Sequence, residues 1–121
     1  MEMSMRVFAP LAFLACLLLA VPVLASAEAQ VGGMWRGSLY GSQLSAFVEQ
    51  DGNAVKAEVV VCALTGETNV YHVVGAIFNG HLYMIHGSGH VFEGDAKGNE
   101  LTGVLTTKGG SKVELHATRT P

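Results

Sequence analysis

The chain has 121 residues, and its seven Lys and Arg side chains against ten Asp and Glu give a formal net charge of −3. The basic residues form no stripe or run, which argues against nucleic acid as a partner. A chain of this length is expected to form one small domain. Of its two cysteines, the first lies in the leader described in the next paragraph, so no disulfide framework is expected.

The first 27 residues have the organisation of a secretory signal peptide. The basic residue Arg6 precedes an apolar run from Val7 to Leu24, and the small residues Ala25-Ser26-Ala27 follow it. A charged start, an apolar centre and an A-x-A site in this order predict cleavage after Ala27. The product is expected to be exported, to a periplasm or to the extracellular space.

Two other interpretations of this leader remain open. The apolar run is roughly long enough for an uncleaved membrane anchor, although no basic cluster follows it. Cys16 could be a lipid-attachment site, although the apolar run continues past it. Cleavage after Ala27 is the preferred interpretation, and it leaves a single domain, residues 28–121, with no membrane span and with Cys62 as its one cysteine.

Turn-forming dipeptides divide this domain into eight predicted strands. All 15 glycines lie in it, and Asn79-Gly80 and Gly109-Gly110 are pairs that tight hairpins favour. The β-rich segments between turns span residues 34–40, 43–50, 54–62, 68–78, 81–87, 90–96, 100–107 and 111–119. Consecutive strands joined by tight turns predict an all-β, antiparallel up-and-down barrel, because closure removes exposed edges. A flattened β-sandwich is the alternative.

Alternation along the strands assigns one face of each to the barrel interior. Large apolar side chains occupy most inward positions. Four glycines also face inward, where they leave room for bends or for side chains from across the barrel: Gly37, Gly75, Gly94 and Gly103. A domain this short is expected to fill most of its interior with its own side chains.

Barrel closure pairs the first predicted strand with the last. Trp35, at the start of the first, then lies near Arg119, at the end of the last, and both face inward. This predicts that the guanidinium lies on the indole face at a closed end of the barrel.

Gly33-Met34-Trp35, with a basic residue near the end of the last strand, resembles the signature of calycin-type barrels, which include lipocalins, fatty-acid-binding proteins and avidins. The resemblance implies a small barrel architecture. It implies no ligand, because avidin-like biotin sites rely on several pocket tryptophans and this chain has one. Lipocalins are also considerably longer.

A short hairpin brings two histidines together. His86 and His90 flank Gly-Ser-Gly and both phase inward, with Met84 on the same face. The two imidazoles could hold a zinc or copper ion, with the Met84 thioether as a further ligand for copper, or they could hold a small anion. They could also contact a small ligand at an open barrel mouth. The alternative is two polar rim residues bonded to each other or to water. The other histidines phase outward: His72, His81 and His116.

The third to fifth predicted strands are apolar on both faces. Their outward side chains include Val60, Cys62, Val74, Phe78, Tyr83 and Ile85. Such a face is normally covered, so it predicts an interface with a second copy or with another envelope protein, with Cys62 at its margin. A shift of phase at a bulge is the alternative. An unpaired cysteine in an exported protein is expected either to be buried and inert or to pair with another chain.

No nucleophile lies in a recognisable catalytic arrangement, and no acidic residue is placed to orient His86 or His90. The sequence therefore predicts an exported, non-catalytic binding or structural module. An oligomeric interaction module and a small-ligand or metal binder are the alternatives.

Overall fold

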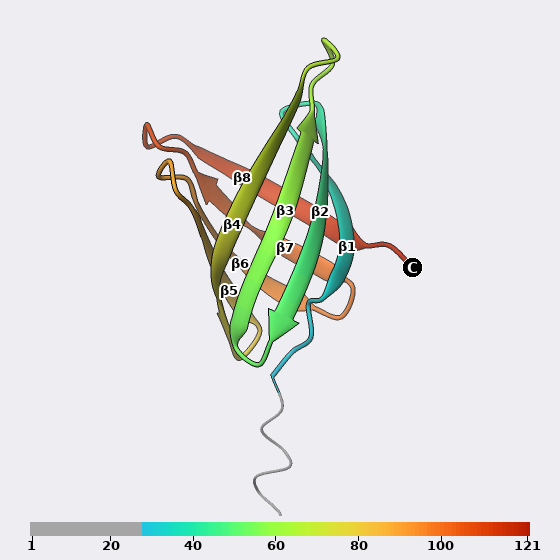
Figure 1. Ribbon diagram of the computed structural model, residues 1–121, viewed down its shortest axis with the longest axis vertical. Coiled ribbons are helices and arrows are strands. Elements are labelled where there is room, and N and C mark those ends of the chain that lie inside the picture. Colours follow the sequence, from blue (N-terminus) through green and yellow to red (C-terminus); the bar gives the residue numbers. More distant parts are fainter. Residues whose placement is uncertain (1–27) are drawn as a thin grey trace, which may run out of the picture.

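The computed structural model describes residues 28–121, which form one closed antiparallel barrel with its eight strands in sequential order (Figure 1). The strands are β1 (Gly33–Leu39), β2 (Ser42–Asp51), β3 (Ala54–Cys62), β4 (Thr68–Phe78), β5 (His81–His86), β6 (Val91–Lys97), β7 (Glu100–Thr106) and β8 (Lys112–Arg119). The predicted barrel is confirmed, and the sandwich alternative is wrong because β1 pairs with β8 as well as with β2. The predicted leader lies outside the described residues.

The turns gather at two opposite ends of the barrel (Figure 1). One end, the mouth, is formed by the turns after β1, β3, β5 and β7, with the β3–β4 hairpin extending furthest. The other end carries the turns after β2, β4 and β6 together with residues 28–32, which precede β1. Residues 28–121 contain no helix long and apolar enough to cross a membrane.

Two of the hairpins turn through residues that have positive φ at both central positions. Tyr40 and Gly41 have φ of 51° and 82°, and Asn79 and Gly80 have φ of 51° and 81°. Turns of this kind match the twist of the strands that they join. Tyr40 therefore belongs to the turn and not to the strand in which the sequence placed it, and β1 ends at Leu39.

The closed end is sealed around the one tryptophan. Trp35 is buried, as are Val31 and Ile77 beside it, and its indole N–H donates a hydrogen bond of 2.8 Å to the carbonyl of Val31. The guanidinium carbon of Arg119 lies 4.8 Å from the centroid of the indole. The predicted stacking of Arg119 on Trp35 is confirmed, and it follows from the pairing of their two strands.

Arg119 also connects three segments at this end through its hydrogen bonds. Its guanidinium donates to the carbonyls of Gly32 at 2.8 Å, Gln30 at 3.0 Å and Gly98 at 2.9 Å. Its Nε donates to the side chain of Asn99 at 3.0 Å. The side chain thus joins residues 28–32 and the β6–β7 turn to the last strand.

Residues 28–32 are fastened across the same end by two further side chains. Gln50 accepts a 2.7 Å hydrogen bond from the Val31 N–H and donates one of 2.9 Å to the Ala29 carbonyl. The Glu28 carboxylate accepts hydrogen bonds of 3.0 Å from the backbone N–H groups of Asn79 and Gly80. These bonds, that from Gly80 foremost, hold the pKa of Glu28 below its ordinary value of 4.5.

The inward glycines are sites of close approach. A Cβ at Gly75 would overlap the backbone of β5 at Tyr83, and one at Gly37 would meet the carbonyl oxygen of His116 at 2.5 Å. Cβ atoms at Gly94 and Gly103 would both meet the ring of Phe92. The room predicted at these positions is therefore taken by neighbouring backbone and by one aromatic ring.

Candidate functional site

The barrel interior contains a cavity of about 310 Å³, called here the inner cavity. The side chains that were expected to fill most of the interior therefore leave part of it open. Ala46, Ala57 and Ala117 occupy inward positions on β2, β3 and β8, and such short side chains leave volume that no other residue reaches. Most of the lining is aliphatic or aromatic and includes Trp35, Leu39, Leu44, Val48, Val59, Val61, Val73, Leu82, Met84, Phe92, Leu105 and Val113.

The burial and polarity of the cavity lining change along the barrel axis. Toward the closed end its lining is buried, as at Trp35, Leu82 and Met84. Toward the mouth the lining is half-buried, and it includes His86, His90, Tyr71 and Thr107. The cavity is thus sealed at one end and opens to solvent at a polar rim.

The two histidines of the β5–β6 turn stand side by side at this rim. Their ring centroids lie 6.0 Å apart, and the edge-on ring of Tyr71 lies 5.3 Å from His86 and 6.3 Å from His90. The prediction that both imidazoles face inward is confirmed, although His90 belongs to the turn and not to β6. Met84 shares their face but lies in the buried core.

The backbone of the mouth holds both imidazoles. Nδ1 of His86 accepts a 3.1 Å hydrogen bond from the Ser88 N–H and lies 2.7 Å from the Ser88 hydroxyl. Nδ1 of His90 accepts a 3.1 Å bond from the Lys108 N–H, in the β7–β8 turn. Two of the four turns at the mouth therefore fix the orientation of the rings.

Residues 28–121 contain no group of three or more His, Cys, Asp or Glu side chains arranged to hold a metal ion. His86, His90 and Met84 supply two imidazoles and a buried thioether, which fall short of the four ligands of a closed zinc site. The residues that line the inner cavity supply no further nitrogen or carboxylate ligand.

The other histidines lie on the outer surface, as predicted. His81 lies between two carboxylates, with Nδ1 3.2 Å from Asp95 and Nε2 3.4 Å from Glu93. Asp95, and then Glu93, raise the pKa of His81 above its ordinary value of 6.5. His116 contacts Glu100 at 3.0 Å, and His72 is exposed.

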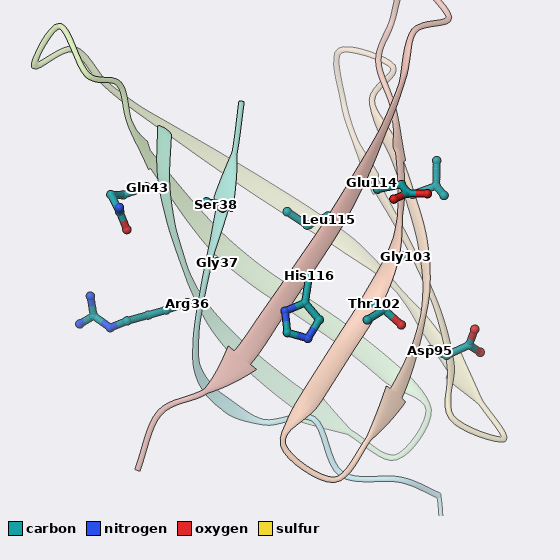
Figure 2. Close-up of a pocket in the computed structure, with 11 residues that line it drawn as sticks. Arg36, Gly37, Ser38, Gln43, Asp95, Thr102, Gly103, Glu114, Leu115 and His116 are labelled. Carbon is teal, nitrogen blue, oxygen red and sulfur yellow. The ribbon is translucent and has the colours of Figure 1, made fainter. Parts of the chain in front are cut away.

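A wider depression of about 890 Å³ lies on the polar outer surface over β1, β7 and β8. Figure 2 shows Arg36 and Gln43 at one side of it and Asp95 and Glu114 at the other, with His116 between them. These exposed side chains do not converge on one point. The inner cavity, which is sealed at one end and mostly apolar, is the better candidate for a binding site.

The predicted apolar outer face is present on β3, β4 and β5. Val74 is 55% exposed, Phe78 63%, Tyr83 45% and Ile85 43%. Cross-strand pairing places Val74 beside Ile85, and Val60, which is half-buried, beside Val70. Cys62 is exposed at the end of β3, as its outward phase predicted. Of the two alternatives for an unpaired cysteine, the buried, inert thiol is therefore wrong, and pairing with another chain stays a prediction.

Two polar residues of the rim were not singled out from the sequence. Tyr71 continues the inward alternation of Val73, Gly75 and Ile77 by one position, and Thr107 continues that of Leu101, Gly103 and Leu105. Extending the two-residue period of these strands past their apolar positions would have placed both residues on the inner face.

Comparison of the chain with models of known protein families and with curated proteins finds no match.

Proposed function

We propose that this chain is an exported, non-catalytic barrel that binds a small, mostly apolar molecule in its inner cavity. The observation that carries the proposal is an apolar cavity of about 310 Å³, sealed at one end and open at the other through a polar rim. Ligand sites in proteins are commonly concave, mostly apolar and supplied with a few polar groups. The export step rests on the leader sequence.

The architecture supports the proposed resemblance to calycin-type barrels, in which Trp35 and Arg119 would mark the closed end. These residues are engaged with each other and with neighbouring backbone. Their part in the proposal is therefore to seal the cavity, while the ligand enters at the opposite end.

Native mass spectrometry of the purified protein, together with titration by an apolar fluorescent probe, tests this function. We expect a bound small molecule or saturable probe binding. We expect Ala57→Phe, which fills the cavity from β3, to weaken binding at least about tenfold, about 1.4 kcal/mol. Ala54→Phe is the matched control, because Ala54 is exposed on the same strand. Absence of binding, or equal binding by both variants, would overturn the proposal.

Self-association through the apolar outer face is the second candidate. It is favoured by the exposure of Val74, Phe78 and Tyr83 on adjacent strands, because contiguous exposed apolar side chains commonly mark an interface. Analytical ultracentrifugation tests it: a dimer that Val74→Glu dissociates is expected, with Thr118→Glu on the polar face of β8 as control. A monomer at high concentration would contradict it.

A further inference from the structure

The hydrogen bonds of His86 and His90 determine where each neutral imidazole carries its proton. A backbone N–H only donates, so a ring nitrogen that receives one must present its lone pair. Nδ1 of His86 receives the Ser88 N–H, and Nδ1 of His90 receives the Lys108 N–H, each at 3.1 Å. Both neutral rings therefore carry their hydrogen on Nε2 and present it as a donor.

The other polar groups of the rim are also able to donate. Thr107 Oγ1 accepts a 3.1 Å bond from the Ser111 N–H, which leaves its hydroxyl hydrogen available. Within residues 28–121, no protein group forms a hydrogen bond with either imidazole Nε2 or with the Tyr71 hydroxyl, and these atoms reach solvent at the mouth. The rim thus offers the inner cavity a set of unused N–H and O–H donors.

The same cavity has no fixed charge. Among the described residues, no Lys, Arg, Asp or Glu side chain lines it. A carboxylate or ammonium group at the rim would meet no fixed opposite charge, and one drawn below the rim would also lose its hydration, which costs several kcal/mol in an apolar environment. A saturated hydrocarbon would enter without that cost but would accept no hydrogen bond from the donors of the rim.

We infer that the ligand is a compact, neutral molecule with an apolar body and a carbonyl head, such as a ketone, ester or lactone. The inference rests on the proposed binding function and names its ligand class. The carbonyl oxygen accepts hydrogen bonds from Nε2–H of His86 and His90, and the body lies against the aliphatic lining. At about 30 Å³ for each water-sized volume, the cavity has room for about ten non-hydrogen atoms.

The proton positions also bear on the predicted zinc or copper site. A metal ion binds a lone pair, and Nε2 offers one only if its hydrogen moves to Nδ1. A hydrogen on Nδ1 would point at the hydrogen of the backbone N–H that now donates to it, from Ser88 in the case of His86 and from Lys108 in the case of His90. Both hydrogen bonds would then be lost. The site is thus built to donate hydrogen bonds and not to coordinate a cation.

Four seven-carbon probes test the ligand class: 2-heptanone, heptanoate, heptylamine and heptane. Trp35 is the only tryptophan and lines the cavity, so its fluorescence, together with calorimetry, reports binding. At pH 8, we expect 2-heptanone to bind at least about tenfold more tightly than the other three. Tighter binding of heptanoate or heptylamine, or equal binding of heptane, overturns the inference.

Variants of the two histidines test whether their N–H groups cause the preference for 2-heptanone. His86→Phe keeps a ring at the rim without the donor and is expected to weaken 2-heptanone binding about tenfold while leaving heptane unchanged. His86→Gln keeps an N–H donor at a similar reach and is expected to restore most of the affinity. His90→Phe repeats the test if His86→Phe fails to fold, as judged by circular dichroism. His72→Phe, on the outer surface, is the control.

The outcomes separate this inference from the binding function. If heptane and 2-heptanone bind equally to the native protein and to the histidine variants, the cavity binds ligands but the donor rim does not select them. If none of the four probes binds and no small molecule co-purifies, the binding function itself fails.

Discussion

Single side chains at the closed end join parts of the chain that are far apart in the sequence. Arg119 lies on the indole of Trp35 and donates to carbonyls of residues 28–32 and of the β6–β7 turn. Both residues could be assigned an inward direction from alternation alone. The carbonyls that surround the guanidinium could not, because no sequence pattern indicates which turn folds beside which strand end.

Arg119→Met is expected to lower the free energy of unfolding by about 2–4 kcal/mol, because it removes four hydrogen bonds and a cation–π contact. Urea unfolding followed by circular dichroism measures the change. Arg36→Met is the matched control: Arg36 is exposed on β1, and its loss is expected to cost less than about 0.5 kcal/mol. Equal effects of the two substitutions would contradict this account of Arg119.

Strand by strand, alternation predicted the architecture because every strand of a closed barrel has one inner and one outer face. The bounds differ from the predicted ones by one residue at several ends. Tyr40 and His90 are the instructive cases, since both were assigned to strands and both belong to turns. Residues that favour strands can also occupy the turn of a hairpin, so propensity alone does not mark the last residue of a strand. The positive φ that assigns Tyr40 to a turn is a property of the folded backbone.

Gly75→Ala is expected to lower the free energy of unfolding by about 3 kcal/mol, because its Cβ would overlap the backbone of β5 and the two strands would have to separate. The midpoint of thermal unfolding measures this. Gly109→Ala has no atom within 4 Å of the added Cβ and is expected to be nearly neutral. A neutral Gly75→Ala would show that β4 and β5 are less closely paired than described.

At the scale of the whole molecule, residues 28–32, which have no regular structure and no strand pattern, cover one end of the barrel that the pairing of β1 with β8 closes. Glu28 caps the β4–β5 turn and Val31 enters the core. Their importance becomes visible only once the barrel end that they cover is formed. The same segment directly follows the predicted cleavage site, so the proposed processing would leave Glu28 as the first residue of the exported chain.

Glu28→Gln is expected to make the folded state less dependent on pH. Because folding lowers the pKa of Glu28, its carboxylate stabilises the protein above the ordinary value of 4.5, and this stabilisation is lost as pH falls through the folded-state pKa. The native protein should therefore exceed the variant in urea midpoint at neutral pH, and the difference should shrink toward about pH 2. Glu114→Gln, on the exposed face of β8, is the control. A difference that stays constant with pH would exclude the carboxylate as its cause.

The sequence by itself determined the number of strands, their order, their inward faces and the meeting of Trp35 with Arg119. Each of these follows from local rules, namely turn chemistry, the two-residue period of a strand and the tendency of a meander to close. The leader and the export that it predicts are likewise read from the sequence alone.

Only the tertiary structure decided that the interior contains a cavity and that backbone N–H groups meet the two imidazoles at its rim. A cavity is the difference between the volume that the strands enclose and the volume that the inward side chains fill, and a sequence states only the second. The proton positions on His86 and His90 depend on two backbone N–H groups, and that from Lys108 lies 18 residues beyond His90. The cavity arises inside the barrel, where short inward side chains face one another, and the proton positions arise where two turns meet at the mouth.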